Sequence, residues 1–551
     1  MTTKNIRVPI PGKKSASQRL LDTIERVGNK VPHPVLMFLY LIILVMVLSH
    51  ILYLFGISVT EEIAVPVTVE AQTNYPIDST EPGLSYPSEP YETDYEIVEQ
   101  TIAIQSLLSV EGLRFIFTYF VAKFAGFSVV AVILVAMVGV GVAEEAGLMS
   151  ALIRKTVTVT PRRLLTFILV FVGVLSSVAT DAGYLILIPL GAIAFMSVGR
   201  HPLAGVAAAF GGVSAVFAVN ILIAPVDGML TEITNEAILL AGGTPITVVA
   251  NFYFAAASTI ILSLVAAFVT DRLIEPRLGK YELADPITSE EDMDTEAQAA
   301  ESRGLRYALY AVLGLGALIL LLTLPPGAPL RDPETGGIIG NTPFMDSLIF
   351  IITLLFLVAG IGYGRGAKTF DSSDDVIRGV TKAFAGLAGL IFMLLMIAQF
   401  IAFFNFSNLP QVIAIWMAEG LEQANIGALP LLIGFVLVIM LLNFIIPNVI
   451  PKWAIFAPIF IPVFLRLDVA PQTVLAAYRL GDSPTNVITP LMVYLPFVLT
   501  IVQRYQKDAG IGTVVALMIP YTLVIAIFWI LLFVIWFVLG IPLGPGYPVG
   551  A

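Results

Sequence analysis

Charged and hydroxyl side chains interrupt an apolar stretch near the C-terminal end of the chain. Residues 478–490 read YRLGDSPTNVITP and lie between two apolar runs. An Arg or Asp at the centre of a bilayer costs about 2.5–3.5 kcal/mol, so Arg479 and Asp482 need a partner or a wet cavity. Secondary transporters build substrate and ion sites from helices broken in this way. The pattern predicts a ligand site within the membrane. A kinked helix with a structural Arg479–Asp482 ion pair is the simpler alternative.

The charged residues suggest distinct roles. A guanidinium grips a carboxylate through two parallel hydrogen bonds, so Arg479 is the candidate for the anionic end of a ligand. Its alternative role is a permanent pair with Asp482. Asp482 and Asp181 are candidate proton carriers, because burial and nearby charge shift the pKa of a carboxyl group. Asp181 could instead cap a half-helix.

Other polar and aromatic residues near the breaks are candidate binding groups. Trp453 offers a stacking face for an aromatic ring, or it packs inside the protein. Lys452 either reaches the ligand or, as we favour, snorkels to the membrane surface. The candidates for neutral hydrogen bonds to the substrate are Asn448, Ser177, Ser483, Thr485 and Asn486. If sodium is used, oxygen ligands could come from Thr180, Asn220 and Asn486. The expected structural hinges are Pro471, Pro484 and Pro490.

The composition is that of a polytopic α-helical membrane protein. Hydrophobic residues make up 58% of the 551 residues and charged residues 13%, and many apolar runs exceed the roughly 18 residues that a spanning helix needs. The absence of cysteine excludes disulfides and thiol catalysis. The three histidines show no metal-ligand spacing, so we expect no metal centre and no cofactor. The net charge of −11 argues against nucleic-acid partners. No cleavable signal peptide is apparent.

The first half of the predicted transporter covers residues 34–280. Residues 1–33 are rich in Lys and Arg, which predicts a cytoplasmic N-terminus. Residues 56–113 are acidic and rich in Pro and Tyr, so we expect a partly disordered outer loop there. Residues 164–199 are apolar but broken by small and polar residues, and each half is too short to span. We interpret them as a re-entrant hairpin entered from the cytoplasm.

The second half repeats this plan over residues 305–551, after an acidic cytoplasmic linker at 281–304. A second hairpin, entering from outside, is predicted over 429–466, and a broken helix over 471–502. The fold class is therefore all-α, with about nine transmembrane helices and two oppositely oriented hairpins in an inverted-topology repeat. The predicted spans are residues 34–55, 124–151, 202–224, 251–270, 305–324, 344–362, 383–404, 471–502 and 513–539.

Over nearly its full length the chain resembles the AbgT family, the bacterial p-aminobenzoyl-glutamate transporters. The most specific blocks are 477–490, 452–460, 180–184 and 399–408. The resemblance implies a multi-pass homodimer in the bacterial inner membrane, in contact with lipid. It implies proton-coupled movement of a folate catabolite, an aromatic amino-acid conjugate, and export of sulfonamide drugs by some members. Family functional positions match at Asp181, Trp453, Pro471, Arg479, Asp482 and Pro490.

The chain departs from the family pattern in two places. The second hairpin tip reads Pro-Asn-Val-Ile-Pro over 447–451, with Ile450 where a serine is expected, and Lys123 stands where relatives often carry Asn. The main rival is a sodium-coupled symporter of dicarboxylates or other organic anions. A channel is a further alternative. An intramembrane aspartyl protease would need Gly-x-Gly-Asp, but Arg479 occupies the first Gly position, so no enzymatic activity is expected.

Overall fold

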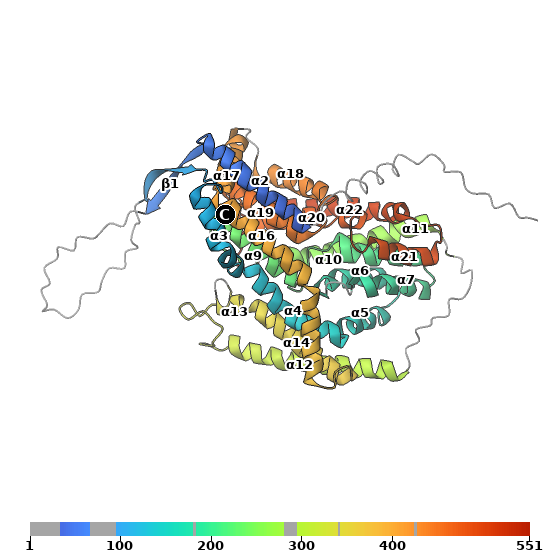
Figure 1. Ribbon diagram of the computed structural model, residues 1–551. Coiled ribbons are helices and arrows are strands. Elements are labelled where there is room, and N and C mark those ends of the chain that lie inside the picture. The colour runs from blue at the N-terminus through green and yellow to red at the C-terminus, as the bar shows by residue number, and fades with distance from the viewer. Residues whose placement is uncertain are drawn as a thin grey trace, which may run out of the picture.

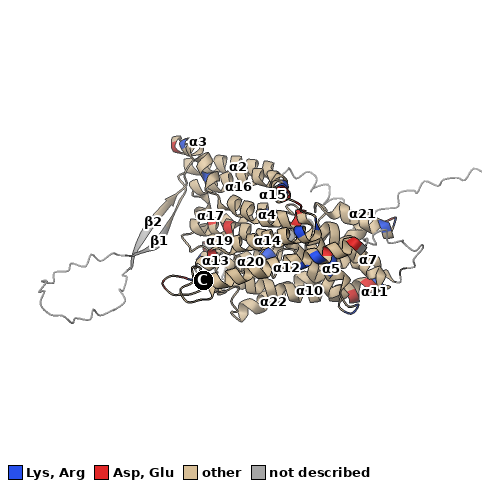
Figure 2. Ribbon diagram, turned by 90° about the horizontal axis from the view of Figure 1, so that it is seen from below, with Lys and Arg blue, Asp and Glu red and all other residues tan. Residues whose placement is uncertain are grey.

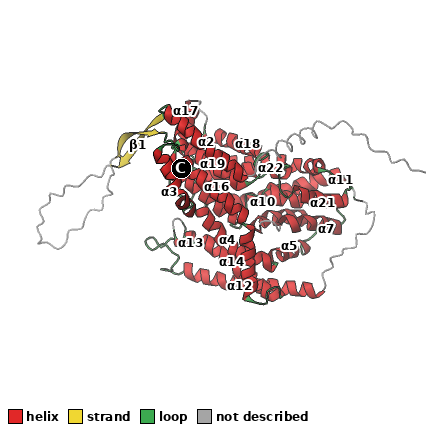
Figure 3. Ribbon diagram, in the orientation of Figure 1, coloured by secondary structure: helices red, strands yellow, loops and turns green. Residues whose placement is uncertain are grey.

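The computed structural model describes residues 34–66, 95–179, 183–279, 281, 295–339, 342–423 and 427–550. Within these ranges nearly all regular structure is helical, with one two-stranded hairpin at one end of the molecule (Figure 3). The elements up to residue 278 are α2 (Pro34–Leu54), β1 (Ser58–Pro66), β2 (Tyr95–Ala103), α3 (Val110–Ala125), α4 (Ser128–Ala146), α5 (Leu148–Thr158), α6 (Leu165–Leu175), α7 (Ile188–Ser197), α8 (Pro202–Phe210), α9 (Pro225–Leu240), α10 (Phe252–Val269) and α11 (Glu275–Leu278).

The second part of the chain is helical throughout its regular elements. These are α12 (Thr295–Thr323), α13 (Pro343–Asp346), α14 (Leu348–Ala367), α15 (Ser373–Gly386), α16 (Ala388–Phe406), α17 (Leu409–Gln423), α18 (Ala428–Leu442), α19 (Val449–Arg466), α20 (Pro471–Asp482), α21 (Leu495–Tyr505) and α22 (Ile511–Val538). Short 3₁₀ or π turns are η1 (Ser176–Ala179), η2 (Gly183–Leu187), η3 (Gly211–Ala215), η4 (Thr270–Ile274) and η5 (Asn486–Ile488).

Eight helical stretches in the described part of the chain are long and apolar enough to cross a membrane. All but one overlap predicted spans; the exception, α19, lies in the second predicted hairpin. The predicted spans 202–224 and 471–502 are not continuous helices: the first ends in η3, and the second is divided between α20 and α21. Charged residues are sparse along the helices (Figure 2), as expected of helices that face lipid or each other.

Two segments predicted as a loop and a linker contain regular structure. The sequence predicts a loop over 56–113, but β1 pairs antiparallel with β2, from Ser58 opposite Ala103 to Pro66 opposite Tyr95. Both strands are rich in β-branched residues, which favour extended backbone. The linker 281–304 also contains helix, because α12 already begins at Thr295. Residues 67–94 and 282–294 lie outside the described part.

Close helix packing gives the body its layered arrangement. Figure 1 shows α12, α14 and α4 along one side, α18, α20 and α22 along the other, and α9 and α10 between them. Between α4 and α14, a Cβ at Gly139 would lie 2.1 Å from the carbonyl oxygen of Thr353, and one at Gly360 would lie 2.8 Å from Ala143. Only glycine allows the two backbones to approach this closely.

Candidate functional site

The site is organised around the end of α20. From Gln472 to Asp482 all residues of this helix are buried, and the chain is not α-helical again until α21. Pro471 occupies the first turn, where a missing N–H does no harm. Pro484 and Pro490 lie in the stretch between the two helices, where their lack of an N–H disfavours a continuous helix. The backbone polar groups of residues 483–494 therefore need partners other than an α-helical ladder.

A close approach of α20 to α18 fixes the position of this end. A Cβ at Gly481 would lie 2.8 Å from the carbonyl oxygen of Val436 and 2.8 Å from Cβ of Ile439. Glycine therefore lets the two helices touch at the turn that precedes the break. The turn that carries Arg479 and Asp482 is therefore held against α18.

Asp482 forms a fully enclosed ion pair with Lys452 of α19. Their Oδ1 and Nζ atoms are 2.7 Å apart, and the side chains are 1% and 0% exposed. The ammonium also donates to Oδ1 of Asn443 at 2.6 Å. Snorkelling of Lys452, the role that the sequence favours, is therefore wrong. Further hydrogen bonds lower the cost of a buried charge pair. Asn443 supplies one to the lysine, whereas Oδ2 of Asp482 is buried without a hydrogen-bond partner in the described part of the chain.

Asn443 also binds the non-helical turn through its amide nitrogen. Nδ2 lies 2.8 Å from the carbonyl oxygen of Asp482, 2.9 Å from Oγ1 of Thr485 and 2.6 Å from Oδ1 of Asn486. An amide group has two protons, so three oxygens share them. Thr485 and Asn486, two predicted ligand-binding residues, are thus occupied by protein partners in this conformation.

Arg479 pairs with a different carboxylate. Its Nη1 forms an ion pair with Oδ1 of Asp227 on α9 and donates to the carbonyl oxygen of Ala218 at 3.1 Å. Nε is buried and has no hydrogen-bond partner in the described part of the chain. The alternative of an Arg479–Asp482 pair is therefore wrong for this conformation. Part of the donor capacity of the guanidinium is unused.

The two halves of the chain meet at the same turn. Oγ of Ser483 accepts a hydrogen bond from the backbone N–H of Ala218 at 3.1 Å and donates to the carbonyl oxygen of Arg479 at 3.1 Å. Nδ2 of Asn486 donates to the carbonyl oxygen of Ser214 at 3.4 Å. The segment after α8 in the first half and the segment after α20 in the second half therefore satisfy each other's polar groups.

Two other predicted binding residues lie next to this contact. Nδ2 of Asn220 is 2.9 Å from Oγ of Ser177, and its Oδ1 accepts from the N–H of Leu222 at 2.9 Å. Both side chains are buried. Thr180 and Asp181, predicted as sodium-ligand and proton-carrier residues, lie outside the described residues. In this conformation Asn220 and Ser177 bind each other.

Trp453 is enclosed rather than presented to a ligand. Its ring stacks on Tyr478 with centroids 4.4 Å apart, and Nε1 donates to Oγ1 of Thr234 at 2.9 Å. The side chain is 0% exposed, which agrees with the alternative of packing inside the protein. Asn448 is exposed and caps α19, since its Oδ1 accepts from the N–H of Ile450 at 3.2 Å.

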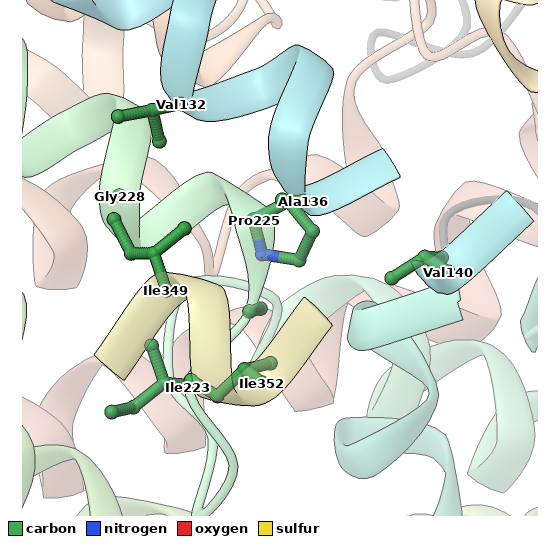
Figure 4. Close-up of a pocket in the computed structure, with 9 residues that line it drawn as sticks. Val132, Ala136, Val140, Ile223, Pro225, Gly228, Ile349 and Ile352 are labelled. Atoms are coloured by element: carbon green, nitrogen blue, oxygen red, sulfur yellow. The ribbon is translucent and has the colours of Figure 1, made fainter. Parts of the chain in front are cut away.

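The first turn of α9 separates this polar turn from an apolar crevice. Figure 4 shows Pro225 and Gly228 facing Val132 of α4 and Ile349 of α14. Asp227, between them in sequence, carries the carboxylate that pairs with Arg479. Among the described residues no cluster of three or more His, Cys, Asp or Glu could hold a metal ion.

Sequence reasoning missed two residues of the site. Asp227 lies 252 positions before Arg479, and no local pattern links them. Its place two residues after Pro225, at the start of a helix, is a signal that could have marked it as a helix cap. Asn443 is a lone amide in an apolar run. Polar residues within membrane helices usually have partners, so its position could have marked it as part of a site.

Known proteins resemble this chain over nearly its whole length. Residues 19–550 match the model of the AbgT putative transporter family. The p-aminobenzoyl-glutamate transport protein of Escherichia coli (strain K12) is 34% identical over 538 residues, which cover 97% of this chain and 98% of that protein. The YdaH transporter of Alcanivorax borkumensis is 36% identical, with a TM-score of 0.82 over 93% of this chain and 100% of that one.

MtrF of Neisseria gonorrhoeae, described as illuminating a class of antimetabolite efflux pumps, is 37% identical. Its structure matches with a TM-score of 0.82 over 96% of this chain and 100% of that one. These relatives are membrane transport proteins rather than enzymes. On these matches, the chain belongs to the AbgT family of transporters.

Proposed function

We propose that this protein is a secondary transporter of p-aminobenzoyl-glutamate, driven by the proton-motive force, that also exports sulfonamide-type antimetabolites. The observation that carries the proposal is the guanidinium of Arg479. It is buried at the break of a helix, and within the described part of the chain its partners meet one terminal nitrogen while Nε has none. A ligand with carboxylate groups offers the bidentate partner that such a guanidinium prefers.

The remaining predicted residues complete the proposed site. Trp453 would meet the aromatic ring only after its stack with Tyr478 opens, and Ser483, Thr485, Asn486, Ser177 and Asn448 would supply neutral hydrogen bonds. Asp181 and Asp482 are the proposed proton carriers. Because Asp482 is paired with Lys452, a proton that reaches Asp482 would release the lysine, and this links protonation to a rearrangement of the turn.

The proposed architecture has two re-entrant hairpins in an inverted repeat. Its support is helix length: α6 has 11 residues and α7 has 10, which at about 1.5 Å per residue is too short for a hydrocarbon core of roughly 30 Å. The segment of α18 and α19 is proposed as the second hairpin. We further propose a homodimer in the inner membrane with a cytoplasmic N-terminus, as the basic first segment favours.

Flux measurements in proteoliposomes test this function. We expect uptake of labelled p-aminobenzoyl-glutamate when a pH gradient is imposed, and no stimulation by a sodium gradient. An Asp482→Asn variant should lose the response to the pH gradient. Flux that follows sodium and ignores pH would refute proton coupling. Absence of flux under both gradients, with a reconstituted and folded protein, would refute the substrate.

A further inference from the structure

The carboxylate that holds Arg479 comes from the other half of the chain. Asp227 is the third residue of α9, whereas Arg479 is in the last turn of α20. The contact is monodentate: one carboxylate oxygen meets Nη1, and the other accepts the N–H of Ala224 at 2.7 Å. An arginine bound in this way forms fewer hydrogen bonds than the paired arrangement that a free carboxylate can offer.

The guanidinium of Arg479 can form more hydrogen bonds than it does in this conformation. Nε is buried without a hydrogen bond in the described part of the chain, and a buried, unsatisfied donor is costly. A carboxylate that engaged Nε together with a terminal nitrogen would remove that cost. The present arrangement therefore satisfies the charge of Arg479 but not its hydrogen-bonding capacity.

Asp227 has a stable place without Arg479. It lies in the first turn of α9, where the backbone N–H groups and the helix dipole favour a negative charge, and Ala224 already donates to it. Its side chain is 16% exposed, whereas that of Arg479 is 4% exposed. The loss of the ion pair would thus leave the carboxylate capped and in reach of water.

From these contacts we infer that Asp227 is an internal substitute for the carboxylate of the substrate: it occupies Arg479 in the empty site and is displaced when an anionic ligand binds. The inference rests on the proposed transport of a carboxylate-bearing ligand. Because the pair bridges α9 and α20, its exchange would also loosen one contact between the two halves when the ligand arrives. Asp227 is a positioning residue that sets affinity, rather than a ligand-binding residue.

The test compares ligand affinity in purified full-length protein. Asp227→Asn keeps an oxygen that can accept from Ala224 but removes the charge. If the paired state holds about 90% of the empty protein, this variant should bind p-aminobenzoyl-glutamate about tenfold more tightly. The same gain is expected for glutarate and benzoate as simpler carboxylate probes. In an Arg479→Gln background the substitution should have no effect on affinity.

Asp375→Asn is the matched control. Asp375 is also the third residue of its helix, α15, where it caps Ser372 and pairs with Arg378. Its substitution should leave the affinity unchanged. Equal or weaker carboxylate binding by Asp227→Asn, with binding still lost in Arg479→Gln, would overturn the inference. If wild-type protein binds glutarate or benzoate but not p-aminobenzoyl-glutamate, the proposed substrate is refuted. The role of Asp227 is then tested with glutarate and benzoate alone.

A thermal unfolding measurement keeps the test informative if Asp227→Asn folds poorly. If Asp227→Asn leaves Arg479 unpaired, added formate should replace the missing carboxylate and raise the thermal unfolding midpoint of the variant, but not that of the wild type. A purely structural cap at Asp227 predicts no response to formate. The absence of rescue together with unchanged affinity would show that Asp227 does not compete for Arg479.

Discussion

Two ion pairs lie within one turn of α20 and differ in exposure and in the kind of atom that they leave without a hydrogen bond. Lys452 and Asp482 are 0% and 1% exposed, and Asn443 accepts a further hydrogen bond from the lysine. Arg479 and Asp227 are 4% and 16% exposed, and Nε of the arginine has no partner in the described part of the chain. In the part of the chain that the structure describes, the first pair leaves an acceptor without a hydrogen bond, Oδ2 of Asp482, whereas the second leaves a donor, Nε of Arg479. Under the proposed function, an unused carboxylate oxygen suits proton uptake by the enclosed pair, and an unused guanidinium donor suits exchange of the Arg479–Asp227 pair with a substrate carboxylate.

The largest effect is expected from breaking the enclosed pair. Asp482→Asn leaves the charge of Lys452 buried and uncompensated, so the free energy of unfolding should fall by about 3–5 kcal/mol. Thermal unfolding of detergent-solubilised protein measures the loss. The double variant Lys452→Met/Asp482→Asn should recover much of the stability without recovering proton-driven transport. Recovery of transport as well would show that the pair is only structural.

A smaller effect is expected where α20 touches α18. Gly481→Ala places a methyl group 2.8 Å from the carbonyl oxygen of Val436, and such overpacking costs about 1–3 kcal/mol. Gly434→Ala, on α18, is the control, because a methyl group there would meet no atom within 4 Å in the described part of the chain. It should be neutral or slightly stabilising because alanine favours helix. Equal stabilities of the two variants would show that this contact does not fix the turn beside the ion pairs.

Trp453 follows Lys452 in sequence and stacks on Tyr478, the residue before Arg479. Its substitution tests whether its ring packs inside the protein or binds the ligand. Trp453→Phe retains a ring to stack on Tyr478 but loses the bond to Thr234, at a cost of about 1 kcal/mol in stability. Because phenylalanine keeps the aromatic face that the proposed site needs, affinity for p-aminobenzoyl-glutamate should change little. A large loss of affinity with unchanged stability would show that the ligand needs the indole N–H rather than an aromatic face.

The smallest effect is expected at an exposed ion pair. The backbone N–H groups of Ser372 and Asp371 hold the pKa of Asp375 below its ordinary value of 3.8, and Arg378 adds to this. A lowered pKa stabilises the fold above the unfolded-state pKa, and the contribution is lost as the pH falls through the folded-state pKa. Asp375→Asn should therefore differ slightly from wild type at pH 7, and the difference should shrink in thermal unfolding as the pH falls below 3.8. A difference that stays constant over that range would contradict this cause.

The sequence predicts the helical class and the family because these depend on patterns within short windows. Apolar runs identify α2, α10 and α22, and the polar, proline-bearing stretch after Arg479 identifies the break that the structure shows between α20 and α21. The family matches confirm the resemblance read from the same stretch.

The partners of the charged residues are not predictable in this way. The carboxylate of Asp227 reaches Arg479 only because α9 and α20 are brought together by the fold, and Lys452 reaches Asp482 because α19 packs on α20. The acidic composition of residues 56–113 likewise conceals two strands of β-branched residues, β1 and β2. Local composition indicates which residues need partners, but not which partners they find.

The most direct measurement compares uptake of p-aminobenzoyl-glutamate with uptake of its uncharged diamide in proteoliposomes. Wild-type protein should strongly prefer the dicarboxylate. Arg479→Gln should abolish that preference, while Asp227→Asn should retain it with a lower KM. If Arg479→Gln transports the two compounds with the wild-type preference, the guanidinium does not recognise the carboxylate, and the proposed exchange of the Arg479–Asp227 pair with the substrate is wrong.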